Sequence, residues 1–222
     1  MAEPATIHIV DDDRAVCDSL SLLLKIEGYS VRSHESARDF LDAIQNDICD
    51  CVITDVRMPG MTGLDLLKEL REQRASLPVI LLTAHADVPL AVQVMKMGAV
   101  DILEKPFNDE ALLASIHQAL KRGKDELAHL AKTQEILAKR ATLTKRESEV
   151  LSGLLKGQPN KVIADEMGIS KRTVEVHRAA VMAKMQAQSL AELVQMALLI
   201  PREELERDTP QSGSTSPAKN SH

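Results

Sequence analysis

Five side chains suited to phosphoryl chemistry each stand directly after, or one residue beyond, a short run of apolar residues. They are Asp11, Asp12, Asp55, Thr83 and Lys105. If the runs are strands of one parallel sheet, these side chains lie at its carboxyl edge, where doubly wound sheets bind their ligands. Their types and positions therefore predict one polar site assembled from several strands.

The carboxylates in this set predict a metal ion. Asp11, Asp12 and Asp55 would repel one another in a shared site unless a hard divalent cation lay between them. Mg²⁺ is the expected ion, because it prefers oxygen ligands and neutralises a phosphoryl group, so that a neighbouring carboxylate can act as nucleophile. Lys105 and the Thr83 hydroxyl would bind the phosphoryl oxygens. Strand-end Asp and Lys residues are common, so the prediction depends on the complete set.

The runs that carry these residues alternate with amphipathic stretches through residues 1–122. The expected strands are 6–10, 29–33, 51–54, 78–82 and 100–103, and the expected helices are about 14–26, 36–46, 63–74, 88–97 and 108–121. Strict alternation with short connections predicts an α/β domain with a five-stranded, doubly wound parallel sheet and helices on both faces.

The length of 222 residues suits two domains. Residues 123–141 have no strand pattern and no proline, which predicts a linker helix after the α/β domain. The spacing of Leu127, Leu130 and Leu137 could give a seam against a partner, but Gln134 interrupts it, so a plain connector is favoured over a coiled coil. Helical patterns through 142–204 predict a small all-α domain, and the polar segment 205–222 predicts a disordered tail.

The net charge of −6 is unevenly distributed. Residues 1–122 carry 12 basic and 20 acidic side chains, whereas residues 142–200 carry 8 basic and 6 acidic ones. Only the second half can be attracted to nucleic-acid phosphates, and an aromatic content of 1% excludes a base-stacking platform for single strands. No apolar run is long enough to span a membrane, and residues 1–4 lack a signal-peptide pattern, so we expect a cytoplasmic protein with no membrane partner.

The three cysteines are not expected to take part in redox sensing or metal binding. Cys17, Cys49 and Cys51 are odd in number, and the pair at 49 and 51 lies in a strand-like run. A lone pair at this spacing supplies too few metal ligands, so buried and unreactive thiols are favoured over redox sensing or metal binding.

Segment 142–204 carries the signals of a helix-turn-helix. Thr144, followed three residues later by Glu147, predicts a capped helix start. Asn160 and Ser170 predict the starts of a short and a longer helix, and Gly168 between them can end the first in a left-handed conformation. In this motif the second helix enters the DNA major groove. We expect phosphate contacts from Lys161, Lys171, Arg172, Arg178 and Lys184, and a groove-facing side with Lys171, Thr173, Glu175, Val176 and Ala179.

The polar site lies in motifs that resemble the receiver domains of response regulators over residues 5–122. The motifs are Val10-Asp-Asp-Asp13, Asp55-Val-Arg-Met-Pro-Gly60, Thr83-Ala84 and Lys105-Pro-Phe107. The resemblance implies that Asp55 is the phosphoacceptor, that Asp11, Asp12 and the Arg57 carbonyl help to hold Mg²⁺, and that the Lys105–Pro106 peptide is cis.

Two positions depart from or vary within that pattern. Ile102 stands where many receivers have Tyr or Phe, so the aromatic rotamer switch of those receivers does not carry over. The second is His85, which is expected with Arg57 near the phosphoryl group, where either can alter the access of water. The alternative for His85 is a solvated loop residue without a role. The lifetime of the acyl phosphate therefore does not follow from the sequence.

The helical segment resembles the LuxR-type domain of the FixJ and NarL group over about residues 142–200. The motifs are Leu143-Thr-Lys-Arg-Glu147, Asn160-Lys-Val-Ile-Ala164 and Thr173-Val-Glu-Val-His177. The third motif is most similar to the FixJ branch, since other branches often have Lys where Glu175 stands. Glutamate can accept a hydrogen bond from cytosine N4, so Glu175 is expected to affect base preference.

The two resemblances imply a two-component response regulator. A sensor histidine kinase would phosphorylate Asp55, and the phosphorylated protein would form a homodimer through its fourth helix and fifth strand, with Val92 and Lys96 at the interface. The dimer would bind a pseudo-palindrome in double-stranded DNA. It would act with RNA polymerase to regulate transcription, as an activator, of nitrogen-fixation or microaerobic genes.

Two other functions are compatible with parts of the pattern. A phosphohydrolase working through an aspartyl phosphate commonly has an Asp two residues after its nucleophile, but Arg57 occupies that position, so no enzyme is predicted. A receiver that acts through protein contacts without phosphorylation is the remaining alternative. The complete set of pocket residues argues against it.

Overall fold

The computed structural model describes residues 4–45, 47–74 and 76–200. The chain divides into two compact units, residues 1–128 and 129–222, and each contains hydrophobic core of its own. The predicted tail at 205–222 lies outside the described residues. None of the helices in the described ranges is both long enough and apolar enough to cross a membrane.

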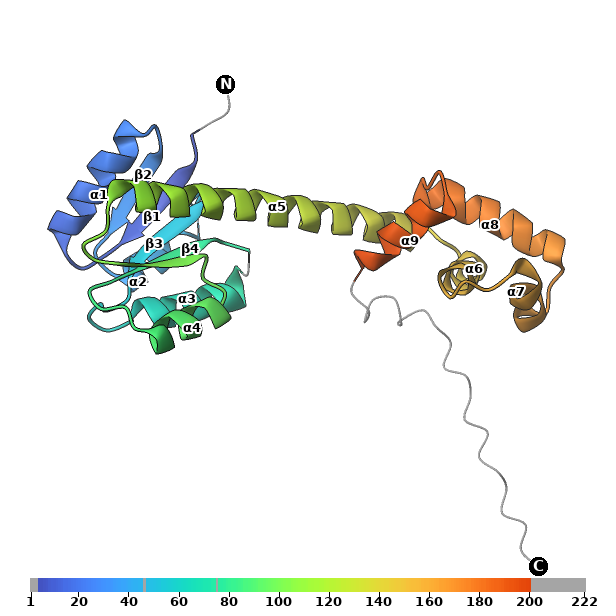
Figure 1. Ribbon diagram of the computed structural model, residues 1–222. Helices are drawn as coiled ribbons and strands as arrows, with labels where there is room; N and C mark the ends of the chain where they lie inside the picture. The colour runs from blue at the N-terminus through green and yellow to red at the C-terminus, as the bar shows by residue number, and fades with distance from the viewer. Residues whose placement is uncertain (1–3, 46, 75, 201–222) are drawn as a thin grey trace, which may run out of the picture. The chain divides into compact units, whose positions relative to one another are not determined.

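A five-stranded parallel sheet forms the centre of the first unit (Figure 1). Its strands are β1 (Thr6–Val10), β2 (Ser30–His34), β3 (Cys51–Asp55), β4 (Val79–Thr83) and β5 (Asp101–Glu104). They pair in parallel in the order β2-β1-β3-β4-β5. The predicted fold class is confirmed, and the direction of winding reverses between β1 and β3.

Helices cover both faces of this sheet (Figure 1). Buried residues of α1 (Arg14–Ile26) and the first part of α5 (Asp109–Ala141) pack on one face. Those of α2 (Ala37–Ala43), α3 (Gly63–Gln73) and α4 (Val88–Lys96) pack on the other. Strands β3 and β4 are buried at every residue, which explains why their sequences are continuous apolar runs.

Side-chain caps fix the helix starts on the side of the sheet that carries the polar site. Asp13 accepts a hydrogen bond from the Ala15 N–H at the start of α1. Thr62 and Asp65 form a reciprocal capping box at the start of α3. Such caps stabilise a helix by about 1 kcal/mol each, and here they fix where the turns after β1 and β3 end.

The stretches predicted as a last receiver helix and a linker helix form one helix, α5. The boundary between the two units falls within it, after residue 128. Gly123 does not interrupt the helix, because it is buried where a Cβ would lie 2.9 Å from Cγ of Pro78. Close packing against Pro78 therefore explains a glycine in the interior of this helix.

The described thiols agree with the expectation of unreactive cysteines. Cys17 and Cys51 are buried and free, and Cys49 is partly buried and free. Burial raises the pKa of Cys49 to about 12 and raises that of Cys51 as well. Thiols with raised pKa values form little thiolate and are poor nucleophiles.

A histidine pair in the first unit was not foreseen from the sequence. His8 is fully buried on β1, and its Nδ1 lies 3.0 Å from Nε2 of His34 at the end of β2. Its Nε2 lies 3.1 Å from the carbonyl oxygen of Ile48. Because a carbonyl only accepts, His8 Nε2 carries the proton and His8 Nδ1 accepts from His34. Burial lowers the pKa of both rings.

The second unit contains the four helices that follow α5 in the described part of the chain. They are α6 (Lys145–Leu155), α7 (Asn160–Met167), α8 (Lys171–Met185) and α9 (Leu190–Leu198). Their buried residues form one core with Ile136 from the end of α5. Gly168 ends α7 with a φ of 65°, and α7 and α8 give the expected helix-turn-helix.

The helix starts in this unit agree with the predicted caps at two positions and differ at one. Thr144 and Glu147 form a capping box for α6, and Ser170 caps α8. Asn160 does not cap α7: it is the first residue of the helix, and Pro159 stands at the N-cap without a side-chain bond. The Asn160 side chain instead accepts a hydrogen bond from Arg178 of α8.

Candidate functional site

Two buried carboxylates and one ammonium form the centre of the polar site. Asp11, directly after β1, is 2% exposed, and Asp55, at the end of β3, is 9% exposed. Nζ of Lys105, directly after β5, lies 2.7 Å from Oδ2 of Asp11 and 2.7 Å from Oδ1 of Asp55. The sheet therefore brings together three of the predicted residues from sequence positions up to 94 residues apart.

Backbone hydrogen bonds hold each of these side chains in place. The Asp13 N–H donates to Oδ1 of Asp11 at 2.9 Å, and the Arg57 N–H donates to Oδ2 of Asp55 at 2.6 Å. The Lys105 N–H donates to the carbonyl of Thr83 at 2.7 Å, and the Lys105–Pro106 peptide is cis. Each carboxylate thus has one oxygen held by the backbone and one facing the ammonium.

The lysine keeps its charge in this environment. Burial on its own lowers the pKa of Lys105, but the hydrogen bonds to Asp11 and Asp55 outweigh burial, and the pKa is raised overall. A fixed positive charge beside two acidic groups can bind the oxygens of an incoming phosphoryl group. The ammonium is therefore placed to bind phosphoryl oxygens, while the two carboxylates leave a net negative charge that a divalent cation would offset.

The donor set fits Mg²⁺ in part. Asp11 and Asp55 supply carboxylate oxygens on adjacent strands, and Mg²⁺ sites commonly use one or two carboxylates with retained waters. Asp12 is exposed and is not drawn into the pair: among the described residues no three His, Cys, Asp or Glu side chains form a group that could hold a metal. Asp11 and Asp55 would hold the ion, and a turn of the Asp12 side chain would be needed for a third carboxylate.

The predicted Thr83 side chain faces its own loop. Thr83 is 2% exposed at the end of β4, and its hydroxyl donates to the His85 carbonyl at 3.0 Å and accepts from the His85 N–H at 3.2 Å. The next residue, Ala86, donates its N–H to Glu104 at 3.2 Å. Glu104 was not predicted as a functional residue, and it ties the β4–α4 loop to the end of β5.

Ile102 and the two predicted interface residues lie beside this loop. Ile102 on β5 is partly buried and packs against the core that contains Val94 of α4. Val92 is 47% exposed and Lys96 is exposed on α4. Ile102 thus makes an apolar contact at the position where many receivers have an aromatic ring. On α4, the exposed apolar side chain of Val92 lies one helical turn from the Lys96 cation.

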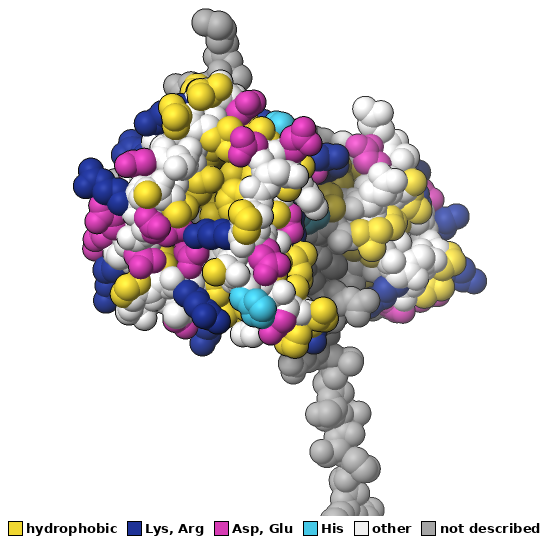
Figure 2. Space-filling model, turned by 60° about the vertical axis from the view of Figure 1, so that its left-hand side comes forward, with side chains coloured by type: hydrophobic (Ala, Val, Ile, Leu, Met, Phe, Trp, Pro, Cys, Tyr) yellow, Lys and Arg dark blue, Asp and Glu magenta, His cyan; other side chains and the backbone are white. Residues whose placement is uncertain are grey.

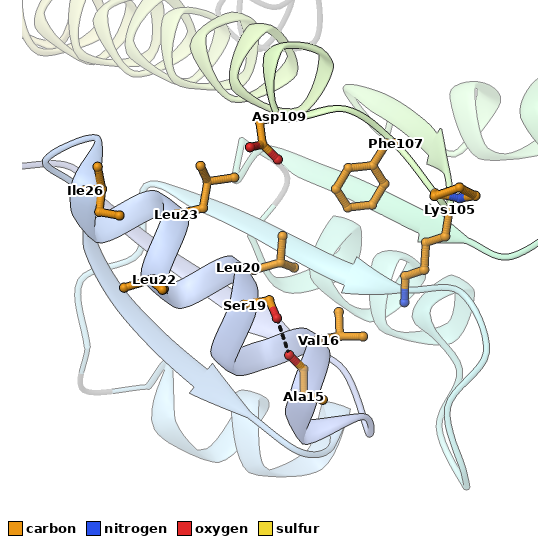
Figure 3. A pocket seen from close by; sticks show the side chains of 11 residues that line it. Ala15, Val16, Ser19, Leu20, Leu22, Leu23, Ile26, Lys105, Phe107 and Asp109 are labelled. Carbon is orange, nitrogen blue, oxygen red and sulfur yellow. Dashed lines mark hydrogen bonds between the residues drawn. The ribbon is translucent and has the colours of Figure 1, made fainter.

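An apolar hollow of 590 Å³ opens next to the polar site. It lies between α1 and the loop after β5, with Leu20, Leu23 and Phe107 in its lining and Lys105 at one end (Figure 3). At its rim Leu22 is 64% exposed and Ile26 is 73% exposed. Figure 2 shows apolar side chains gathered on the face of the first unit turned to the viewer, with acidic and basic side chains around them.

Helix α8 presents most of the predicted DNA contacts. Its buried stripe is Val174, Val181 and Met185, and helical geometry places Arg172 and Val176 on the opposite side. The exposed residues predicted to contact DNA are Lys161 on α7 and Lys171, Arg172, Glu175, Val176 and Ala179 on α8; Thr173 and Arg178 are partly buried.

Lys184 and Thr173, both predicted to contact DNA, have close hydrogen-bond partners within the unit. Nζ of Lys184 lies 2.6 Å from Oε2 of Glu147, which is 6% exposed, and it also donates to the Thr142 carbonyl. Lys184 thus neutralises a buried carboxylate on α6, which the sequence did not reveal. The Thr173 hydroxyl lies 2.8 Å from that of Ser170 and belongs to the cap of α8.

Comparisons with known proteins match both units. The family "Response regulator receiver domain" matches residues 7–117, and "Bacterial regulatory proteins, luxR family" matches residues 141–197. The transcriptional regulatory protein FixJ of Bradyrhizobium diazoefficiens is 47% identical over 89% of this chain and 97% of its own length. The chain belongs to the FixJ-like response regulators.

Other relatives agree with this FixJ-like assignment. FixJ of Azorhizobium caulinodans is 50% identical over 90% of this chain and 94% of its own length. Among solved structures, the response regulator StyR is similar with a TM-score of 0.72 and 37% identity over 89% of this chain and 99% of the other. Full-length FixJ from B. japonicum gives a TM-score of 0.56 and 46% identity over 89% and 98%.

The FixJ-like chain is thus a two-component response regulator with a receiver domain and a LuxR-type DNA-binding domain. It is a regulator of transcription and not an enzyme. Response regulators act with sensor kinases and with DNA, so both are partners of this class.

Proposed function

We propose that Asp55 accepts a phosphoryl group from a sensor histidine kinase and that this modification promotes dimerisation and DNA binding. The observation that carries the proposal is the ammonium of Lys105 held at 2.7 Å from both Asp11 and Asp55. A cation fixed between two carboxylates at the carboxyl edge of a sheet can bind the oxygens of a phosphoryl group as it reaches Asp55. The domain limits that accompany the proposal are a receiver at 1–122, a linker helix at 123–141 and a DNA-binding domain at 142–204.

The transfer is a displacement at phosphorus. Oδ of Asp55 attacks the phosphorus of a phosphohistidine, the P–N bond breaks, and the imidazole nitrogen leaves with the electron pair and takes up a proton. The Arg57 N–H holds the second Asp55 oxygen, which fixes the direction of attack. Mg²⁺ held by Asp11, Asp12, Asp55 and the Arg57 carbonyl would neutralise negative charge on the phosphoryl group.

A protein donor suits the surface beside Asp55. A phosphohistidine can reach the carboxylate only if its own domain contacts the receiver next to the polar site. The hollow between α1 and the loop after β5 supplies apolar contact area there, with Leu22 and Ile26 exposed at its rim. We therefore place the kinase on this face.

The β4–α4 loop is the proposed path of the signal. When the Thr83 hydroxyl turns to a phosphoryl oxygen, it gives up both hydrogen bonds to His85. The loop then loses its hydrogen bonds between Thr83 and His85 but keeps the hydrogen bond from the Ala86 N–H to Glu104. Movement of the loop shifts the start of α4, which carries Val92 and Lys96, and no aromatic side chain is required at Ile102.

The phosphorylated protein would regulate transcription in the cytoplasm. A two-fold dimer would place two α8 helices in successive major grooves and recruit RNA polymerase as an activator. Thr173, Glu175, Val176 and Ala179 would lie on the groove-facing side with Lys171, and Lys161, Lys171, Arg172 and Arg178 would contact phosphates. Lys184 has a stabilising role through Glu147. The resemblance to the FixJ group makes nitrogen-fixation or microaerobic genes the proposed targets.

Asp55→Asn tests the assignment of the phosphoacceptor. Incubation with acetyl phosphate and Mg²⁺ should add one phosphoryl group to the wild-type protein and none to Asp55→Asn, because the amide is not a nucleophile for phosphorus. Intact-protein mass spectrometry measures the added mass, and a Mg²⁺ chelator should prevent labelling of the wild type.

Asp13→Asn is the matched control, since Asp13 is a neighbouring acidic residue that caps α1 and does not contact Lys105. It should be labelled like the wild type. Label that persists in Asp55→Asn, or labelling lost equally in Asp13→Asn, would contradict the assignment.

A further inference from the structure

Helix α4 is buried near its end and exposed at its start. Val94, in the second half of the helix, is its one buried residue, and Ala99 and Val100, which follow the turn after α4, are buried as well. Near the start of the helix Leu90 is only partly buried, and Val88 is 76% exposed. Apolar packing therefore holds the end of α4 more strongly than its start.

An arginine of α3 binds the turn that follows α4. Nη1 of Arg71 donates to the Leu77 carbonyl at 2.8 Å, and Nη2 donates to the Gly98 carbonyl at 3.0 Å. Leu77 lies shortly before β4 and Gly98 shortly before β5. Both contacts are therefore at the amino edge of the sheet, opposite the polar site, and one guanidinium joins α3 to the turn after α4.

The contact between Arg71 and Gly98 is close and involves a charged donor. Gly98 has a φ of 88°, and a Cβ at this position would lie 3.0 Å from Nε of Arg71. Burial lowers the pKa of Arg71, and the nearby charge of Arg122 lowers it further, but a guanidinium stays protonated in proteins. Hydrogen bonds from an ionised donor are about twice as strong as neutral ones. The end of α4 is therefore held by polar contacts as well as by packing.

The start of α4 depends on hydrogen bonds that lie beside the polar site. The Thr83 hydroxyl bonds both the carbonyl and the N–H of His85, and the Ala86 N–H donates to Glu104. His85 and the N-cap residue Asp87 are exposed. A phosphoryl group that draws the Thr83 hydroxyl away from His85 would thus act on the weakly held start of α4 and leave the contacts at its end in place.

We propose that Arg71 is the positioning residue that holds the end of α4, so that phosphorylation of Asp55 redirects α4 by moving its start. In a helix fixed at one end, displacement grows with distance from that end. Val92, which is six residues before Gly98 and so about 9 Å away along the helix, would move more than Lys96. The inference rests on the proposed function and adds a fixed point to it, and it requires no aromatic side chain at Ile102.

The test compares dimerisation of the full-length protein with and without phosphorylation by acetyl phosphate and Mg²⁺. Analytical ultracentrifugation gives the two dissociation constants, and their ratio measures the coupling. Arg71→Ala should reduce this ratio about 2-fold to 30-fold, the usual effect of a residue that carries coupling between sites, because both ends of α4 can then move. The rate of Asp55 labelling should equal that of the wild type, since Arg71 lies at the opposite edge of the sheet.

Arg74→Ala is the matched control. Nη2 of Arg74, at the end of α3, donates to the Ile44 carbonyl at 2.7 Å, so this arginine joins α3 to the segment after α2 and not to α4. Both variants remove a hydrogen bond from a guanidinium to a carbonyl and should lower the stability toward urea. Only Arg71→Ala should also lower the coupling ratio, which a purely structural role of Arg71 would leave unchanged.

Hydrogen exchange of the wild-type protein tests the fixed end without a substitution. Phosphorylation should speed amide exchange in residues 84–91 and leave residues 97–100 protected, because local opening is confined to the weakly held part of an element. The backbone N–H groups of 97–100 are all hydrogen-bonded in the unphosphorylated protein. In Arg71→Ala these four should exchange faster even without phosphorylation.

The outcomes distinguish the inference from the proposed function. Wild-type dimerisation that ignores phosphorylation contradicts the proposed function and the inference with it. Coupling in the wild type that is unchanged in Arg71→Ala, or reduced equally in Arg71→Ala and Arg74→Ala, overturns the inference alone. Phosphorylation that speeds exchange in residues 97–100 as much as in 84–91 overturns it as well.

Discussion

Replacing Lys105 by alanine is expected to slow phosphorylation of Asp55 by about 100-fold or more, the usual cost of removing one fixed group that stabilises charge in a transition state. The ammonium contacts Asp55 at 2.7 Å, and its raised pKa keeps it charged throughout the neutral range. The rate of mass gain with acetyl phosphate and Mg²⁺ measures the effect. Lys68→Ala, which removes an exposed lysine of α3, should retain the wild-type rate.

The same substitution has a consequence for stability that depends on pH. Lys105 has a higher pKa in the folded protein than the ordinary 10.5, so its contribution to stability is complete below 10.5 and is lost as the pH rises through the folded value. The difference in unfolding free energy between wild type and Lys105→Ala should therefore be constant across neutral pH and shrink only in alkali.

A wild-type rate of phosphorylation in Lys105→Ala would contradict the proposed role of Lys105 in the transfer.

Gly63→Ala is expected to destabilise the receiver by about 3 kcal/mol or more, at the upper end of the cost of overpacking. A Cβ at Gly63 would lie 2.1 Å from the carbonyl oxygen of Asp55 and 3.2 Å from Cα of Val56. Both are backbone atoms, so relief of the clash must displace the segment that carries the phosphoacceptor. Urea unfolding measures the loss of stability, and labelling by acetyl phosphate should slow in the folded fraction.

Gly60→Ala is the control, because Gly60 lies in the loop just before α3, which begins at Gly63. Gly60 has a φ of 77° and no atom within 4 Å of an added Cβ, so its cost is limited to the left-handed backbone, about 1 to 2 kcal/mol. If Gly63→Ala proves no more destabilising than Gly60→Ala, the close approach of α3 to the Asp55 backbone does not limit the residue at position 63.

The fold and the grouping of Asp11, Asp55 and Lys105 could be predicted from the pattern of strands. The apolar runs before Asp11 and Asp55 are strands because both faces of the sheet are covered, and parallel strands necessarily bring their carboxyl ends together. The same reasoning applies to Thr144 and Ser170, whose hydroxyls cap helices that begin one residue later. The residue types next to each strand and helix end were sufficient to predict these features.

Contacts between distant side chains could not be predicted in this way. Lys184 was expected to bind phosphate, but its partner Glu147 is 37 residues away, and nothing in the spacing shows that α6 and α8 bring them together. Asn160 has the sequence character of a cap, yet the proline before it and Arg178 across the unit give it another role. The pair of His8 and His34 likewise depends on the alignment of two strands.

If phosphorylation of Asp55 controls the DNA-binding domain, it must change the affinity of the protein for target promoter DNA. Phosphorylation of wild-type protein should raise the affinity about 5-fold to 150-fold, the usual range of coupling between two sites. Asp55→Asn treated in the same way should retain the low affinity of the unphosphorylated protein. Equal affinities for phosphorylated and unphosphorylated wild type would contradict the account and favour a receiver that acts through protein contacts alone.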